Sequence, residues 1–181
     1  MITYLRKKAP FTGAFLLWGC LFCVLTAVAD EVVTVRQVTD GDSLRLTDGR
    51  KVRLIGINAP ELGRDGKADE PLAAPARDRL KALIGDQAVT LETGPDRFDR
   101  YGRLLAYIKL ANGKSAGESL LQQGLASVIA IAPNLAHSGQ YRRAEAIARQ
   151  QRIGIWAHPY FQPVSANSLH RTMTGYRFVR G

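Results

Sequence analysis

Five residues in two short clusters of this chain carry oxygen atoms that could bind a metal ion or move a proton. In the first cluster, Asp40 and Asp42 flank a glycine where an expected strand ends. Hard cations often find their oxygen ligands in such turns. In the second, three residues within four positions offer an amide oxygen (Asn58), a backbone carbonyl (Ala59) and a carboxylate (Glu61). Alone, each cluster is also typical of an ordinary turn.

Cationic and aromatic side chains gather in a third cluster, residues 99–103. Arg100, Tyr101 and Arg103 surround a glycine there, and taken alone this pattern is typical of a solvated hairpin. A further arginine, Arg53, begins the apolar stretch that leads into the second cluster. Planar guanidinium groups match phosphate oxygens with paired donors, whereas an ammonium group acts as a point charge. The arginines therefore indicate a site for a phosphate-like anion.

Together the clusters contain what the hydrolysis of a phosphodiester requires. Negative charge gathers on the equatorial oxygens of the transition state, and Arg53 and Arg103 could stabilise it. A divalent ion near Asp42 would neutralise more of this charge, and Glu61 could orient or deprotonate the attacking water. This hypothesis requires a fold that brings the three clusters together.

The segment that connects the second cluster to Arg53 is residues 52–61. Its residues 53–57 are apolar apart from Arg53 and Gly56, and Pro60 ends it because proline has no amide hydrogen to donate. We predict one short strand here, with Arg53 and Glu61 at its opposite ends.

Alternating apolar residues and turn signals predict five strands. Asp48-Gly49 is a strong two-residue hairpin signal, so the first three strands form an antiparallel meander. A turn-rich segment, residues 94–102, joins the last two strands. The five expected strands are residues 32–38, 43–46, 52–57, 89–92 and 103–110.

Helical spacing of apolar residues predicts three helices, at residues 71–84, 116–123 and 138–151. One lies between the third and fourth strands and two follow the fifth. This order predicts an α+β fold, a five-stranded Greek-key β-barrel of the OB type. Residues 62–70 are expected to form a surface loop, and Trp156 to fill the core.

The first 29 residues have the pattern of a signal peptide. Three basic residues precede an apolar run, and Ala27-Val28-Ala29 supplies the small residues that signal peptidase reads. We expect cleavage after Ala29 and an exported protein, either periplasmic or secreted. A membrane anchor is the alternative, but about a dozen apolar residues fall short of the roughly 20 that a span needs. A lipoprotein attached through Cys20 is a second alternative.

The expected mature chain is one domain, residues 30–158, followed by residues 159–181. We interpret the latter as a tail or as the truncated start of a further segment, in which residues 176–179 resemble a strand with nothing left to pair.

Both cysteines leave with the leader, so no disulfide is expected. Without the three leader cations, 22 basic and 16 acidic residues leave a net charge of +6. This excess favours polyanionic partners such as nucleic acid.

These motifs together resemble the thermonucleases, or staphylococcal-nuclease-like proteins. The similarity runs from about Val32 to Trp156, through five motifs in the order of that family. The five are Asp40-Gly41-Asp42-Ser43, Val52-Arg53-Leu54-Ile55-Gly56-Ile57-Asn58-Ala59-Pro60-Glu61, Asp99-Arg100-Tyr101-Gly102-Arg103, Gln123-Gly124-Leu125-Ala126 and Ile155-Trp156. The resemblance implies an OB-fold nuclease that uses calcium to cut DNA and RNA with low sequence preference and leaves 3′-phosphates. It also implies a monomer with no stable membrane insertion once the leader is cleaved.

The resemblance implies a role for each polar residue of the motifs. Arg53 and Arg103 match the two arginines that hold the scissile phosphate, and Glu61 matches the glutamate usually assigned as general base. Arg100 and Tyr101 match a lysine and a tyrosine that contact a nucleotide phosphate.

The same resemblance implies a calcium site with one departure from the family pattern. Asp42 matches the main calcium carboxylate, Asp40 an acidic neighbour of the metal, and Ala59 a residue that ligates through its carbonyl. Asn58 stands where the best-known pattern has a second aspartate. The amide keeps an oxygen ligand but removes a full negative charge, so we expect weaker calcium binding.

A second departure concerns two tyrosines that lie against the nucleotide in the best-studied member. Ala130 and Ala132 match them here, and stacking on an aromatic ring contributes about 1–3 kcal/mol per base. Substrate affinity should therefore depend more on charge and fall steeply with salt. The alternative to a nuclease is a non-catalytic module with the same barrel that binds nucleic acid or a protein.

Overall fold

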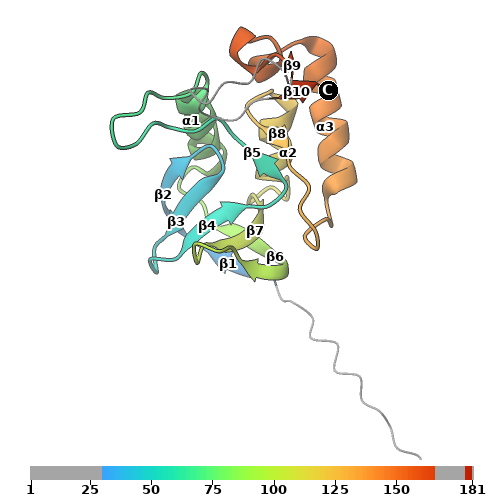
Figure 1. The fold of residues 1–181 in the computed structure, drawn as a ribbon. Coiled ribbons are helices and arrows are strands. Elements are labelled where there is room, and N and C mark those ends of the chain that lie inside the picture. Colours follow the sequence, from blue (N-terminus) through green and yellow to red (C-terminus); the bar gives the residue numbers. More distant parts are fainter. Residues whose placement is uncertain (1–29, 166–177, 181) are drawn as a thin grey trace, which may run out of the picture.

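A curled six-stranded sheet forms the centre of the fold in the computed structural model, which describes residues 30–165 and 178–180 (Figure 1). The expected leader, residues 1–29, lies outside the described residues. The strand order is β1-β6-β7-β4-β3-β2. The strands are β1 Glu31–Val33, β2 Val35–Asp40, β3 Ser43–Leu46, β4 Lys51–Leu54, β6 Val89–Phe98 and β7 Leu104–Lys109.

The sheet curls because its two edge strands are consecutive in sequence. Only Thr34 separates β1, which pairs with β6, from β2, which pairs with β3 at the other edge. The expected first strand, residues 32–38, is therefore two strands, and the fold has six barrel strands where five were predicted. The predicted α+β OB-type barrel with three helices is confirmed.

Alternation along the strands separates an inner face from an outer face. Leu44, Leu46, Val52 and Leu54 point into the core, and each is at most 3% exposed. Since successive strand residues point to opposite faces, their polar neighbours on β3 and β4 lie on the outer face. Burial of each large apolar side chain stabilises the fold by about 1.5–3 kcal/mol.

Three helices cover the barrel, at the positions that the sequence predicted to within two residues. They are α1 Ala73–Ile84, α2 Ala116–Gln122 and α3 Ser138–Gln151. Helix α1 packs against β2, and α2 packs against both β7 and α3. The Ser115 hydroxyl caps α2 by accepting a hydrogen bond from the Glu118 amide, as a serine at this position favours. Within residues 30–165 and 178–180, no helix is long and apolar enough to cross a membrane.

The predicted single strand over residues 52–57 is wrong. Strand β4 ends at Leu54, and the chain turns at Gly56, which has φ +83°. The next strand, β5 Ile57–Asn58, leaves the large sheet and pairs with β8 Ser127–Val128. Arg53 and Glu61 are therefore not at opposite ends of one strand, because the turn folds the second polar cluster back toward Arg53.

Replacing Gly56 with alanine should destabilise the protein through two separate effects. A non-glycine residue in the left-handed region costs roughly 1–2 kcal/mol. In addition, the new Cβ would lie 2.9 Å from the ring of Tyr141, which is 1% exposed and fixed in the core. Urea unfolding should show the loss as a lower midpoint.

Gly113→Ala provides the matched control. Gly113 has a similar φ, +78°, but a Cβ there would meet nothing within 4 Å. Overpacking typically costs about 1–3 kcal/mol, and only Gly56→Ala should show it. Equal losses in the two variants would contradict a steric role for Tyr141.

Residues after the main domain also pack on it. Phe161 is 3% exposed, and β9 Val164–Ser165 pairs in parallel with β10 Val179–Arg180. The expectation that residues 176–179 have nothing to pair is thus wrong for Val179, the strand residue described there.

The expectation that Trp156 fills the core is also wrong. Its neighbour Ile155 is buried, while Trp156 lies half-buried with its ring 3.9 Å from the Arg149 guanidinium.

Candidate active site

The turn after β2 buries both aspartates of the first cluster. Gly41 makes this possible because a Cβ there would lie 2.6 Å from that of Ala59 and 2.7 Å from that of Ala76 on α1. Asp40 and Asp42 are 2% and 3% exposed. The polar atoms of Asp42 are satisfied by the Ala59 amide at 2.9 Å, by the Ser43 hydroxyl at 2.9 Å and by Arg53.

Arg53 is held in place by the first and second clusters together. Its guanidinium forms an ion pair with the Asp42 carboxylate. Its Nη2 also donates to Asn58 Oδ1 at 3.0 Å, across the turn at Gly56. The Arg53 side chain is 14% exposed. Its position is thus fixed before any ligand binds, and preorganised donors are the ones that stabilise transition-state charge.

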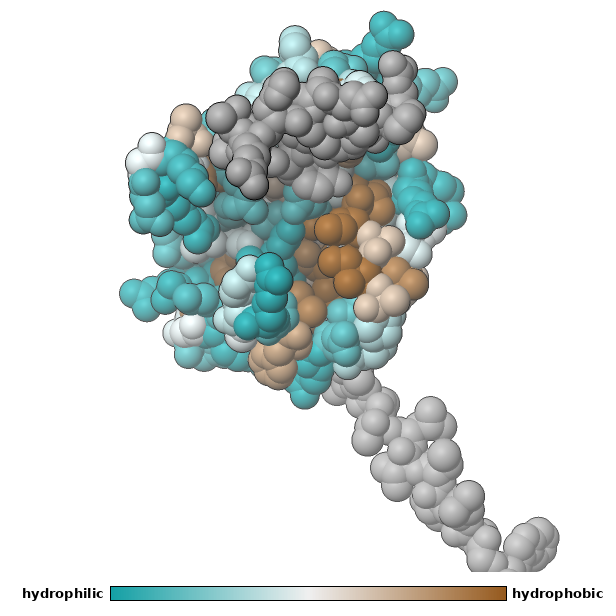
Figure 2. Space-filling view, in the orientation of Figure 1, coloured by the Kyte–Doolittle hydropathy of each residue, from teal (hydrophilic) through white to brown (hydrophobic). Residues whose placement is uncertain are grey.

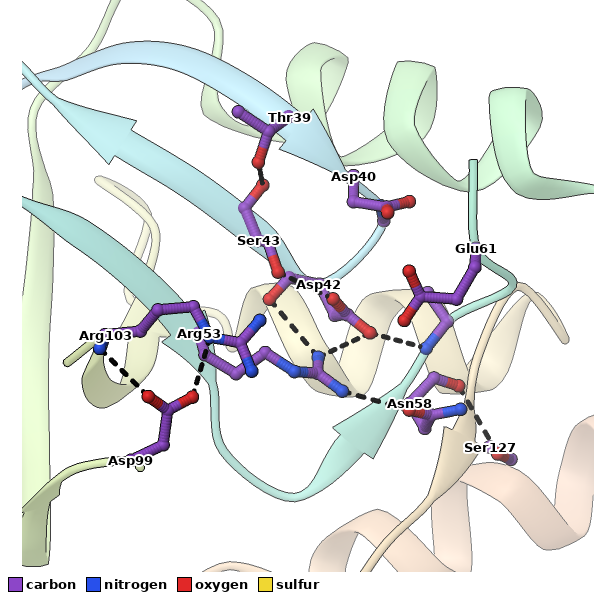
Figure 3. Close-up of polar contacts among 12 residues, drawn as sticks. Thr39, Asp40, Asp42, Ser43, Arg53, Asn58, Glu61, Asp99, Arg103 and Ser127 are labelled. Carbon is purple, nitrogen blue, oxygen red and sulfur yellow. Dashed lines mark hydrogen bonds and ion pairs between the residues drawn. The ribbon is translucent and has the colours of Figure 1, made fainter. Parts of the chain in front are cut away.

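Glu61 faces the buried aspartates from the turn after β5. In Figure 3, Asp42 lies between Glu61 and Arg53, with Asp40 nearby. The Glu61 residue as a whole is exposed, but its carboxyl group is partly enclosed by neighbouring atoms. Partial burial raises the pKa of Glu61, and the like charges of Asp42 and Asp40 raise this pKa further. A carboxylate with a raised pKa is a stronger base toward water.

Burial and repulsion also raise the pKa of Asp40. Burial is the larger cause and the Asp42 charge adds to it, while Arg64, 3.9 Å away, and the Gly41 amide act in the opposite direction. Three carboxyl groups thus interact in a small volume, with Arg53 and the exposed Arg64 as the nearby cations. The cluster would be stabilised by more positive charge.

Arg103 projects from the hairpin that joins β6 and β7. Its Nε donates to Asp99 Oδ2 at 2.6 Å, and the Asp99 carboxylate also accepts from the backbone amides of Tyr101 and Arg103. Partial burial acts to raise the pKa of Asp99, but these hydrogen bonds outweigh it and lower the pKa. Asp99 therefore stays ionised and holds Arg103, a role that the sequence did not assign to it.

The structure divides the predicted site residues into two groups. Asp40, Asp42, Arg53, Asn58, Ala59 and Glu61 form one contiguous cluster. Arg103 and Tyr101 come from the β6–β7 hairpin and line one groove of about 650 Å³ with Glu61. The Arg100 guanidinium lies 4.8 Å from the centroid of the Tyr101 ring, and its Nη2 donates a hydrogen bond to the Tyr101 hydroxyl.

Two residues of the site gave no clear signal in the sequence. Arg64 lies in the expected surface loop but reaches toward Asp40. Glu70 ends the same loop, and its carboxylate accepts a hydrogen bond from the Glu61 amide at 3.0 Å, which fixes the turn that carries Glu61. Both interactions join loop residues that pattern alone cannot pair.

An apolar cavity of about 370 Å³ adjoins the two arginines. Arg53 and Arg103 line it together with Phe98, and Ile131 lines it from the loop after β8. Figure 2 shows the apolar surface gathered beside β5. Among the residues matched to family tyrosines, Ala132 lines this cavity and Ala130 does not; the adjacent Ile129 does. The loop thus presents aliphatic side chains to the cavity.

The donor set is compatible with a hard cation such as calcium. Asp42 and Asp40 offer carboxylate oxygens, Ala59 a backbone carbonyl and Asn58 an amide oxygen, all of the class that calcium prefers. However, within the described ranges no group of three or more His, Cys, Asp or Glu side chains is arranged so that it could hold a metal ion alone. A cation here would need water or substrate oxygens to complete its shell.

Chemically, the arrangement can hold an anion between two fixed guanidinium groups beside a basic carboxylate. Glu61, Arg53 and Arg103 come from three different segments, and the turn at Gly56 and the Asp99 contact bring them to one face. Those groups are suited to an in-line attack of water on a phosphodiester.

Comparison with known proteins agrees with this chemistry. The family described as "Staphylococcal nuclease homologue" matches residues 51–158. SPbeta prophage-derived endonuclease YokF and endonuclease YncB, both from Bacillus subtilis (strain 168), are each 35% identical over 130 residues, 69% of this chain. These regions are 44% and 61% of the two relatives, so the chain spans about half their length. The thermonuclease of Staphylococcus hyicus is 28% identical over 160 residues, 87% of this chain and 89% of the relative.

Proposed function

The chain belongs to the staphylococcal nuclease homologues, and from this premise we propose that it is a nuclease that hydrolyses phosphodiester bonds. One observation carries the proposal: Arg53 and Arg103 line the same cavity, each held by an aspartate, and Arg103 shares the adjoining groove with Glu61, a glutamate of raised pKa. A binding module has no need of a basic carboxylate at that point.

In this proposal Glu61 activates water and the two arginines stabilise the phosphorane. Glu61 accepts the proton of the attacking water, or orients that water, from the groove that it shares with Arg103. Charge that develops on the equatorial oxygens is met by the guanidinium groups of Arg53 and Arg103. Tyr101 and Arg100, exposed on the hairpin, contact a neighbouring phosphate of the substrate.

Calcium is the proposed cofactor. Asp42, Asp40, Asn58 and the Ala59 carbonyl would hold it, and the interacting carboxyl groups of Asp40, Asp42 and Glu61 support a cation here. When bound, the ion supplies Lewis-acid neutralisation of phosphate charge.

The finer features of the substrate and location also belong to the proposal. DNA and RNA are the proposed substrates. The protein cuts them with low sequence preference, and the products carry 3′-phosphates. The net charge of +9, or +6 without the leader, and the cationic groove support a polyanionic substrate. Export to the periplasm or the medium is proposed from residues 1–29 alone, and action as a monomer from the family resemblance.

A cleavage assay tests the proposed function. Purified protein should convert supercoiled plasmid DNA to smaller products with calcium, and should do so no longer once a chelator removes the ion. Single-stranded RNA should be degraded under the same conditions. Binding of DNA without cleavage, unaffected by chelator, would show instead that the protein is a non-catalytic binding module.

Replacing Asn58 with aspartate should tighten calcium binding. The natural chain is expected to bind calcium with a Kd near 10⁻⁴–10⁻³ M, the weak end of the range for extracellular modules. A second carboxylate would raise the ligand charge, and we expect a Kd about tenfold lower or better. Calorimetric titration measures both values. Saturation of the natural chain at low micromolar calcium would show that Asn58 does not weaken the site.

A further inference from the structure

A row of long cationic side chains crosses the outer face of the sheet next to the candidate active site. Lys51 on β4 is directly opposite Arg45 on β3. Two residues further along β4, Arg53 is opposite Ser43. Since residues two apart share a face, Arg45 and Lys51 lie on the same face as Arg53. On the other side of β4, the register Val52 to Leu104 places Arg103 beside Lys51.

These two cations have no partners within the part of the chain that the structure describes. The side chains of Arg45 and Lys51 form no hydrogen bond or ion pair there, and Lys51 is exposed. In contrast, Arg50, the residue before Lys51, is paired with both Glu31 and Asp48. Like charges directly opposed across an antiparallel pair destabilise a sheet. Two unpaired cations therefore lie directly opposite each other at positions where neutral residues would make the sheet more stable.

The row continues into the candidate active site through one groove. Arg45, Lys51, Arg64 and Arg103 line this groove of about 650 Å³, and Glu61 is the one acidic residue among its lining residues. Since Arg64 and Arg103 face Asp40 and Asp99, the unpaired positive charge of this groove comes from Arg45 and Lys51, at some distance from the proposed water-activating carboxylate. A chain with regularly spaced negative charges fits this distribution, whereas a single anion would use only one end of it.

We infer that Arg45 and Lys51 bind phosphates of the substrate chain beyond the scissile one, so that a polynucleotide lies along the outer face of β3 and β4. This deepens the proposed function and rests on it. Arg45 and Lys51 are binding residues that extend the site; they do not touch the reacting atoms. Their contacts carry no base information, since phosphate contacts set position and affinity rather than sequence.

The test compares Arg45→Gln/Lys51→Gln with Arg79→Gln/Lys81→Gln. The control removes one exposed arginine and one exposed lysine from α1, outside the groove, and neither has an ion pair with a described residue. Binding of a fluorescent oligothymidylate of about 16 nucleotides, the upper site size of one OB fold, is measured by anisotropy in chelator. The salt concentration is varied between about 50 and 200 mM.

The groove variant should bind the oligonucleotide more weakly, and the slope of log affinity against log salt should fall by about 1.4, which is 0.7 for each lost contact to a single strand. Binding of a dinucleotide should be unchanged. Thermal unfolding should show the variant to be no less stable than the natural chain, because repulsion is removed. A groove variant that binds the oligonucleotide as the α1 control does would overturn the inference.

Cleavage assays keep this result separate from the proposed function. With calcium, the groove variant should retain the natural kcat on the dinucleotide and show a raised KM on the longer chain. If the natural chain cleaves neither substrate, the proposed activity is wrong, while the anisotropy slopes still decide the binding site. If it cleaves both and the groove variant has an unaltered KM, the activity stands and the inference is wrong.

Discussion

Arg53→Lys should lower kcat for phosphodiester cleavage by about 10²–10³, the usual effect of removing one preorganised transition-state donor. Lysine keeps the positive charge beside Asp42 but loses the planar fork that reaches both Asp42 and Asn58. The contribution lost is therefore orientation of the donors rather than charge. Steady-state kinetics on single-stranded DNA, with calcium in excess, measures the change.

Lysine is the better substitution because alanine would confound the result. Arg53 and Asp42 are both largely buried, and removing one partner of a buried pair costs about 3–5 kcal/mol of stability. Arg50→Lys is the control, since Arg50 pairs with Glu31 and Asp48 at the exposed surface and should leave kcat unchanged. Full activity of folded Arg53→Lys would rule out a catalytic fork at this position.

Asp42→Asn should have the second large effect, a shift of the calcium response to much higher concentrations together with a loss of most of the activity. Asp42 is the buried carboxylate shared by the Ala59 amide, the Ser43 hydroxyl and the Arg53 guanidinium. Its amide analogue keeps the volume but removes the charge that a cation would need. At a calcium concentration that saturates the natural chain, we expect cleavage to fall by about 10² or more, because metal-ion stabilisation of the transition state is worth several kcal/mol.

Two comparisons show whether this loss comes from the calcium site. Asp48→Asn removes an exposed carboxylate from the hairpin between β3 and β4 and should leave the calcium dependence unaltered. Raising calcium should restore part of the activity of Asp42→Asn if the residue is a ligand. An unchanged calcium titration curve in this variant would place the cation elsewhere.

Much of the fold could be predicted because its main signals are local. Asp48-Gly49 forms the expected hairpin between β3 and β4, and helical spacing placed α1, α2 and α3. The division of the first strand could not be predicted, since nothing at Thr34 marks a break. That break exists because the curled sheet needs its edges joined there, and this requirement comes from tertiary structure.

The candidate site residues were selected by type from the sequence, but their arrangement could not be predicted. The apolar run around Gly56 has the composition of one strand, and only the positive φ of Gly56 and the pairing of β5 with β8 show that it bends. The contact between Glu70 and the Glu61 amide joins residues across a loop without a periodic pattern. Residue identity thus predicts the chemistry available, while packing decides which groups meet.

The close approach of Gly41 to Ala59 and Ala76 restricts which sequences this fold can accept. The two alanines leave no room for a side chain at residue 41, because a single added methyl there would already overlap both of them. The helix that carries Ala76 and the turn that carries Ala59 are therefore coupled through one small volume. Among functional relatives, the three positions should vary together rather than independently, and an enlargement at one should be found only where another has become smaller or the helix has moved.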